Sequence, residues 1–323
     1  MFNTIVKLVS DSLLNCTDGP NGVVTARVYL SRIESTFIVA LLGSTLISLA
    51  TACLGILHII YISFYVTQRY RRAFIVYLAG TAPFVSTLSL VAMYMPRVWF
   101  LSHLLGFLYF SIALWVIICL LMNIFEGRQK NGEKNEKWLF KDKRTNTATL
   151  LCFPIGRIRF CEMMVFQAPC IRLIFTILSL ILYFEYQDGA IMALKILDFI
   201  SLPSLLIGIY GTHILVTTVS NLDELIPYRY IVVFRLLDFY FMFYGIQQPI
   251  FDLLARAGIF GCGTVLPSLE TAFFWKNFVL VIESFFVSLI STVLLKPSRS
   301  AFFDKYPSSR SVASSVITCE YNI

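Results

Sequence analysis

The chain has 323 residues, of which 58% are hydrophobic and 14% charged, and its mean hydropathy is +0.77. This composition offers too little polar surface for a soluble fold of that length, so it predicts an all-α membrane protein with several spans. The formal net charge of +7 does not indicate nucleic-acid binding, because no soluble segment interleaves basic residues with stacking aromatic residues. The excess charge lies in loops, where lipid headgroups attract Lys and Arg.

Seven long apolar stretches follow one another along the chain, each bounded by charged residues, proline or polar residues. Each supplies about the 17 to 25 residues that a helix needs to cross roughly 30 Å of hydrocarbon. The fourth stretch begins beside Pro169 and carries Arg172, which can reach the headgroups from one turn inside a helix end. The predicted spans are 37–66, 73–95, 98–125, 169–186, 196–219, 230–251 and 271–295.

The basic residues between these spans fall mostly on alternate sides. If the loops after the first, third and fifth spans and the C-terminal tail are cytosolic, 19 of the 26 Lys and Arg residues lie in the cytosol. The positive-inside rule then predicts an outside N-terminus and a cytosolic C-terminus. The predicted regions are an extracellular tail (1–36), a seven-helix membrane domain (37–296) and a cytosolic tail (297–323). Asn15, in the only N-x-S/T sequon, is the predicted glycosylation site.

Cysteines suggest two modifications. Cys152, Cys161 and Cys170 lie in an apolar and basic segment beside the fourth span. Thiols in such a position can carry an acyl chain that enters the bilayer, so we expect S-palmitoylation there, with free thiols as the alternative. Whether Cys16 and Cys262 form a disulfide on the outside is left open, because the sequence gives no distance between them.

No pattern in the sequence indicates an enzyme. His58, His103 and His213 lie on three different spans without a carboxylate or cysteine at metal-ligand spacing. The chain also has no G-x-S-x-G motif and no glycine-rich phosphate loop. We therefore predict neither a metal site nor a cofactor.

Polar groups inside the spans are candidates for a solute pathway, because each is costly in lipid unless it is paired or hydrated. Gln247 and Gln248 precede Pro249 at an expected kink of the sixth span. Glu283 lies deep in the seventh span, with Lys276 two helical turns before it as a possible counter-charge. The cytosolic end of the third span adds two further polar groups. The residues predicted to line a pathway are Gln247, Glu283, Asn123 and Glu126.

Four segments carry a family resemblance: TAPFVSTLSLVAMYMPR (81–97), FEG (125–127), QQPIFDLLARAGIFGC (247–262) and IESFFVSLI (282–290). In this order they resemble the alpha subunit of the organic solute transporter and, more loosely, its transmembrane-184 relatives. That family has a cysteine-rich loop before the fourth span, where the three cysteines of this chain are dispersed rather than contiguous. The positions that match the family are Pro83, Pro96, Arg97, Glu126, Gly127, Gln247 and Glu283.

The resemblance implies a plasma-membrane or endomembrane subunit that moves steroid conjugates, bile-acid-like anions and related solutes by facilitated diffusion. It also implies a small single-span beta-type partner. An amphipathic solute needs an apolar slot with a few polar groups, and we expect this slot between the third, sixth and seventh spans. Gln247 and Glu283 would face it, with Glu283 protonated or paired with Lys276, while Pro83 and Pro96 shape the second helix.

Two other functions stay open. A trafficking or membrane-organising adaptor would share the topology without transporting a solute. A seven-span receptor is disfavoured, because the third span ends in NIFEG (123–127) rather than D/E-R-Y. The seventh span likewise ends in LLKPS (294–298) rather than N-P-x-x-Y.

Overall fold

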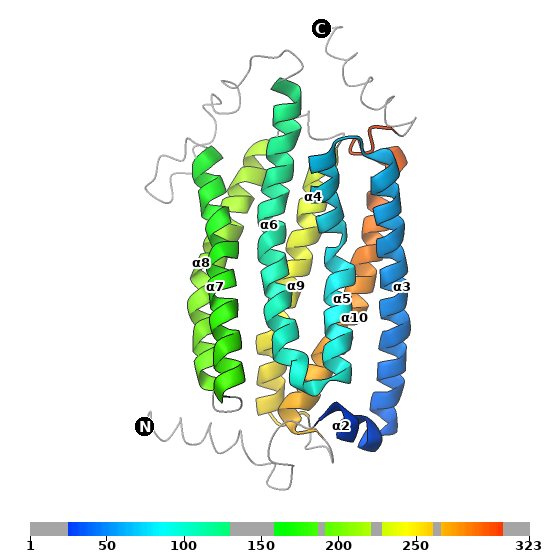
Figure 1. Ribbon diagram of the computed structural model, residues 1–323, viewed down its shortest axis with the longest axis vertical. Coiled ribbons are helices and arrows are strands. Elements are labelled where there is room, and N and C mark those ends of the chain that lie inside the picture. The colour runs from blue at the N-terminus through cyan, green and yellow to red at the C-terminus, as the bar shows by residue number, and fades with distance from the viewer. Residues whose placement is uncertain (1–24, 130–157, 187–190, 221–227, 261–265, 306–323) are drawn as a thin grey trace. The chain divides into compact units, whose positions relative to one another are not determined.

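Helices form nearly all of the regular structure in the part of the chain that the computed structural model describes: residues 25–129, 158–186, 191–220, 228–260 and 266–305. Within these ranges, seven helical segments are long and apolar enough to cross a membrane (Figure 1). The prediction of an all-α protein with seven spans is confirmed, whereas the orientation of the termini stays a prediction. The spans are Ser35–Tyr65, Arg69–Tyr94, Pro96–Ile124, Glu162–Tyr186, Ile196–Thr217, Tyr230–Ala255 and Ser268–Leu294.

The helices owe their form to the lipid around them. A hydrocarbon environment offers no partner to backbone N–H and C=O groups, so each spanning segment satisfies them within its own helix. Apolar side chains such as Leu42, Leu46 and Leu49 are exposed on the outside of the protein, where lipid replaces water. In chain order the helices are α2 (Ala26–Arg32), α3 (Ser35–Tyr65), α4 (Arg69–Ala79), α5 (Thr81–Tyr94), α6 (Trp99–Gln129), α7 (Ile158–Tyr186), α8 (Ile191–Ser220), α9 (Tyr230–Arg256) and α10 (Ser268–Leu294).

The chain divides into two compact units. Unit 1 comprises Met1–Ile56, Ala82–Gly106 and Leu236–Ser291. Unit 2 comprises the remaining segments, Leu57–Thr81, Phe107–Arg235 and Thr292–Ile323. The division falls inside α3, α5, α6, α9 and α10, so each of these five helices contributes residues to both units.

Unit 1 has a core in which α3, α5 and α10 meet. Leu41 of α3, Met93 of α5 and Val281 of α10 are buried in one hydrophobic cluster. At its edge Phe37 packs edge-on against Phe274, with ring centroids 4.9 Å apart. Outside the spans, α2 inserts Tyr29 into the unit, and burial raises the pKa of its hydroxyl above the ordinary value.

A glycine allows α3 to approach α5 closely. A Cβ atom placed on Gly55 would lie 2.5 Å from Cγ of Pro83, which is shorter than any ordinary carbon contact. Seven residues before Gly55, the Ser48 hydroxyl accepts a hydrogen bond of 3.0 Å from the buried Ser86 hydroxyl. Close backbone approach with hydroxyl pairing is a common way for membrane helices to associate.

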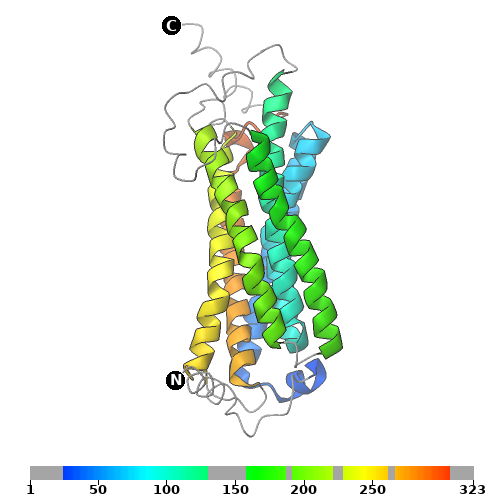
Figure 2. The same cartoon turned by 90° about the vertical axis from the view of Figure 1, so that its left-hand side faces the viewer.

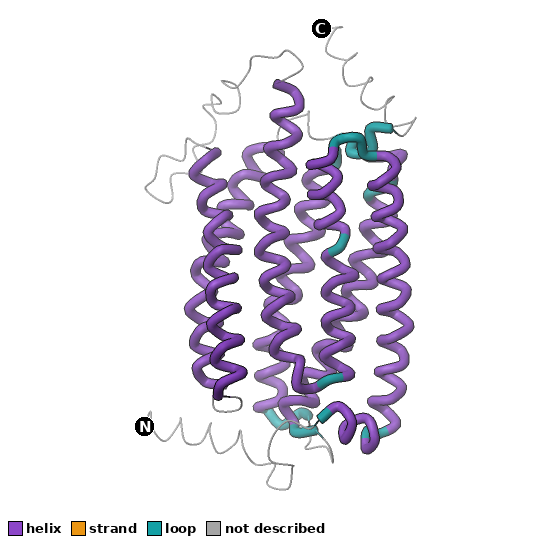
Figure 3. Tube along the Cα trace, viewed as in Figure 1, coloured by secondary structure: helices purple, strands orange, loops and turns teal. Residues whose placement is uncertain are grey.

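The predicted second span is two helices rather than one. α4 ends at Ala79, Gly80 donates its N–H to the Val76 carbonyl at 2.9 Å, and α5 begins at Thr81 (Figure 3). Pro83, the third residue of α5, has no N–H to donate to the carbonyl of Ala79. Hydropathy alone does not detect this break, because both helices are apolar.

In unit 2, α4 packs on α6 and α7 on α8. The rings of Tyr77 (α4) and Tyr109 (α6) stack with centroids 4.4 Å apart, and each hydroxyl donates to the backbone carbonyl of the other residue at 3.2 and 2.7 Å. α7 and α8 lie side by side (Figures 1 and 2). A Cβ on Gly208 of α8 would lie 2.8 Å from Cβ of Ala168 of α7, so this glycine permits their close contact.

The fourth span begins earlier than predicted. α7 starts at Ile158 and continues through Pro169, so Arg172 lies near the middle of the helix rather than one turn inside its end. Its side chain is buried. The expectation that it reaches the headgroups is therefore wrong. If Arg172 is left out of the basic residues assigned to the cytosol, most Lys and Arg residues still lie on the predicted cytosolic side.

The beginning of the predicted cytosolic tail folds back onto unit 2. The Asp304 carboxylate accepts a hydrogen bond from Thr67 at 2.8 Å and pairs with Arg71 at 3.3 Å. The backbone N–H of Lys305 donates to the Tyr65 carbonyl at 3.1 Å, and Phe302 is buried. Residues 297–305 thus form part of the folded structure.

Candidate functional site

Polar side chains gather where α9 and α10 face each other within unit 1. The amide nitrogen of Gln247 (α9) donates a hydrogen bond to Oε1 of Glu283 (α10). Gln247 is buried and Glu283 half-buried. The two residues singled out by sequence as the best pathway candidates are therefore direct partners across two helices.

A second cross-link joins the same helices, at a position two helical turns before Glu283 on α10. Nζ of Lys276 donates to Oε1 of Gln248 at 2.5 Å, and the Lys276 side chain is buried. The carboxylate of Asp252 acts on this ammonium electrostatically. The structure thus gives Lys276 an amide partner, whereas the sequence suggested Glu283. We call Gln247, Gln248, Lys276 and Glu283 the polar seam.

Tyrosines extend this contact along α9. Tyr240, Tyr244 and Gln247 recur at spacings of three and four residues and so share one helix face. The Tyr240 hydroxyl lies 2.6 Å from that of Ser284, which itself donates to the Leu280 carbonyl. Because Ser284 has a single proton, Tyr240 is the donor of the pair.

Tyr244 fixes α9 against α6. Its hydroxyl donates to the carbonyl of His103 at 3.2 Å, and its ring lies over Gly106, where a Cβ atom would come within 2.0 Å of the hydroxyl oxygen. The glycine therefore provides the space that this tyrosine occupies.

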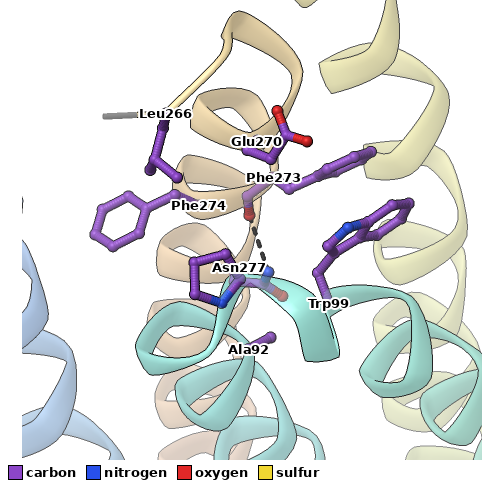
Figure 4. Close-up of a pocket in the computed structure, with 8 residues that line it drawn as sticks. Ala92, Trp99, Leu266, Glu270, Phe273, Phe274 and Asn277 are labelled. Atoms are coloured by element: carbon purple, nitrogen blue, oxygen red, sulfur yellow. Dashed lines mark hydrogen bonds between the residues drawn. The ribbon is translucent and has the colours of Figure 1, made fainter. Parts of the chain in front are cut away.

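A small hollow lies near the start of α10 (Figure 4). Its empty space of about 250 Å³ includes open solvent, so the enclosed part is well below the roughly 300–1,000 Å³ of most ligand pockets. Trp99 stacks on Phe273 with centroids 4.0 Å apart, and the Asn277 amide donates to the Phe273 carbonyl at 2.9 Å. Glu270 supplies a carboxylate. Nothing in the sequence pattern distinguishes these residues from core residues.

The other predicted pathway residues, Asn123 and Glu126, belong to unit 2, whereas the seam belongs to unit 1. Asn123 lies on α6, half-buried, and its Oδ1 has no hydrogen-bond partner among the residues that the structure describes. Glu126 belongs to the helical part of α6, but its side chain lies outside the described structure. The four residues of the seam lie on α9 and α10.

The three predicted helix-shaping prolines occupy different positions. Pro83 is the third residue of α5, and Pro96 opens the 3₁₀ turn Pro96–Val98 between α5 and α6. Pro249 lies inside α9, which continues through it. At the end of α9, Gly258 adopts a φ of +72°, and the bonds from Gly258 to Ala255 and from Ile259 to Leu254 form a Schellman motif.

Most predicted modification sites fall outside the described residues. The structure does not describe the segments that contain Asn15, Cys152 and the pair Cys16 and Cys262. Cys161 belongs to α7, but its side chain also lies outside the described structure. Cys170 is an exposed free thiol within α7, one residue after Pro169. It thus lies in the fourth span rather than in the loop before it.

The polar seam can accept hydrogen bonds. Oε1 of Gln247 and Oε2 of Glu283 are buried and have no hydrogen-bond partner within the described protein. Buried acceptors of this kind cost free energy unless water or a ligand supplies a proton. Hydroxyl groups of a solute are suitable donors for both.

Comparison with known proteins gives one consistent result. The family model described as "Organic solute transporter Ostalpha" matches residues 40–299. Organic solute transporter alpha-like protein 2 of Caenorhabditis elegans is 59% identical over 97% of this chain and 94% of its own length. Alpha-like protein 3 of the same organism is 30% identical over 94% and 91%. Organic solute transporter subunit alpha of Danio rerio is 21% identical over 70% and 72%. No solved structure matches the chain.

Proposed function

The chain belongs to the organic solute transporter Ostalpha family, and on this premise we propose that it carries amphipathic solutes across the plasma membrane by facilitated diffusion. It is a multi-pass membrane protein and a transporter subunit. We propose steroid conjugates and bile-acid-like anions as the solutes. Facilitated diffusion requires no cluster of ion-coupling carboxylates, and the polar seam contains a single one.

The observation that carries the proposal is the pair of unpartnered acceptors in the seam, Gln247 Oε1 and Glu283 Oε2. They lie in apolar helices, where a polar group without a partner is expected to serve a function. The hydroxyl groups of a sterol or bile-acid nucleus can donate to both acceptors. The hollow beside α10 is too small for a whole sterol, so we expect helix movement during transport.

We also propose a single-span beta-type partner. The relative from Danio rerio is named a subunit, which implies an assembly of more than one chain. A single helix with an apolar surface can pack against any of the lipid-exposed faces of this protein. Lipid contacts cover the remaining exposed apolar residues.

The test is uptake of a labelled sterol sulfate by cells that express the chain with candidate single-span partners. We expect uptake that saturates with solute and requires both chains. Glu283→Gln and Gln247→Leu should change the rate at matched surface levels. Glu185→Gln, at an exposed position near the end of α7, is the control and should have no effect.

Two results would contradict the proposal. Uptake equal to that of untransfected cells, with the chain present at the surface beside its partner, would support the adaptor function. Uptake unchanged by both seam substitutions would place the pathway elsewhere in the protein.

A further inference from the structure

A buried arginine near the middle of α7 links α7 and α8 within unit 2. Nη1 of Arg172 donates to Oδ1 of Asp198 at 3.1 Å and to the Ser201 hydroxyl at 2.7 Å. The Ser201 hydroxyl in turn donates to the backbone carbonyl of Asp198 at 2.7 Å. The guanidinium carbon lies 4.7 Å from the ring centroid of Phe107 on α6. Three helices therefore hold the position of this charge.

The arginine lies deep in the membrane. It is ten residues from Glu162 and fourteen from Tyr186, the ends of the fourth span, which correspond to about 15 and 21 Å of helix. At that depth a lipid headgroup is an unsuitable partner. Ionisable residues in the middle of a span usually mark the pathway of a solute or ion.

The guanidinium is only partly paired. Both of its hydrogen bonds use Nη1, while Nε and Nη2 are buried without a hydrogen-bond partner in the described protein. The Nε–Nη2 edge is a planar fork that matches the two oxygens of a carboxylate or sulfate. An ion pair that served stability alone would be expected to satisfy these donors.

The two charges also differ in exposure. The side chain of Arg172 is 7% exposed and that of Asp198 is 33% exposed. The carboxylate can therefore move away from the arginine more easily than the arginine can leave its position over Phe107. An incoming anion can compete with Asp198 for the guanidinium.

We propose that Arg172 is the anion-binding residue of this carrier. Its Nε–Nη2 edge receives the sulfate or carboxylate group of an amphipathic solute, and Asp198 balances the charge when no solute is bound. The inference rests on the proposed transport function and adds the charged group that the solute must carry. Ser201 and Phe107 are positioning residues that keep the guanidinium in place.

The test compares a sterol sulfate with the uncharged parent sterol. Arg172→Gln alone would leave Asp198 without its partner and can fail to fold, so the main variant is R172Q/D198N, which replaces both charges by amides. We expect this variant to reach the surface and to take up the uncharged sterol like the wild type. Its kcat/KM for the sulfate should fall by about tenfold to one-hundredfold, because hydrogen bonds to a charged group are lost.

Two further variants separate anion binding from a structural role. The charge swap R172D/D198R keeps an ion pair between α7 and α8 but transfers the guanidinium from α7 to α8, away from its position over Phe107. We expect the thermal stability of this variant to match that of the wild type, while its uptake of the sulfate stays low. Arg235→Gln removes an exposed arginine of α9 and should leave the uptake of both solutes unchanged.

Several outcomes would overturn the inference. Wild-type uptake of the sulfate by R172Q/D198N or by the charge swap would show that Arg172 does not bind the anion. An equal loss of both solutes at matched surface levels would indicate a structural role. If the wild-type protein takes up neither solute, the proposed transport function itself is wrong. This result differs from one in which the protein transports both solutes and uptake of the sulfate does not change when Arg172 is replaced.

Discussion

The hydrogen bond between Gln247 and Glu283 is expected to hold α9 to α10. Replacing Gln247 with leucine removes the donor to Oε1, and Oε2 of Glu283 already has no partner among the described residues. The carboxyl group would then have no hydrogen bond on either oxygen in an apolar surrounding. The substitution should therefore destabilise unit 1 as well as change transport.

The loss in the free energy of unfolding depends on whether the acceptor, the Glu283 carboxyl group, is charged. A hydrogen bond to a charged group contributes about 1.5–3 kcal/mol and one between neutral groups about 0.5–1.5 kcal/mol. We expect Gln247→Leu to lower the free energy of unfolding by roughly 1–3 kcal/mol. Removing both partners in Q247L/E283L should cost less than the sum of the single substitutions, because no unpaired polar group stays buried.

The assay is a double-mutant cycle on purified protein in detergent, with thermal unfolding followed by tryptophan fluorescence. For domains of 150–250 residues, 1 kcal/mol corresponds to about 2–4 °C in the midpoint temperature, so a shift of several degrees is measurable. Gln68→Leu is the control, since Gln68 is exposed and makes no side-chain cap to α4. Strictly additive shifts, or a Gln247→Leu protein as stable as the control, would refute the reasoning.

Three further predictions concern packing, topology and modification. Gly55→Ala should lower stability by about 1–3 kcal/mol, because the added methyl meets Pro83 at 2.5 Å. Gly43→Ala in the same helix should be neutral or stabilising, since nothing lies within 4 Å of its Cβ position; equal effects in thermal unfolding would argue against the close packing. A tag at Ile323 should bind antibody only after permeabilisation, and Asn15→Gln should abolish a glycosidase-sensitive shift; antibody binding to intact cells would reverse the topology. Acyl-biotin exchange should give a signal that disappears when all three candidate cysteines are changed to serine, and an equal signal from both proteins would exclude acylation there.

Hydropathy predicts the spans well because the thickness of the bilayer imposes their length. It predicts their ends less well where proline is involved. Pro169 was expected to begin the fourth span, yet α7 passes through it. Neighbouring helices can satisfy the backbone groups that a proline frees within a membrane helix. The break at Gly80 was also missed, because apolar residues continue on both sides of it.

The polar residues were identified from sequence, but not all of their partners. Gln247 and Glu283 are conspicuous because they interrupt apolar helices, and the structure pairs them. Lys276 binds Gln248 instead of Glu283, since partner choice depends on how the two helices are rotated. The ion pair of Arg172 and Asp198 joins two spans, and a single sequence gives no contact between spans.

Counterflow in liposomes tests the central claim, that solute passes through this protein, most directly. The chain, purified together with its partner subunit, is reconstituted into vesicles loaded with unlabelled sterol sulfate, and entry of labelled sterol sulfate is followed. A carrier that works by facilitated diffusion exchanges the two pools, so we predict a transient accumulation of label above its equilibrium level. Entry no faster than in protein-free vesicles, or entry unaffected by the internal solute, would contradict the account.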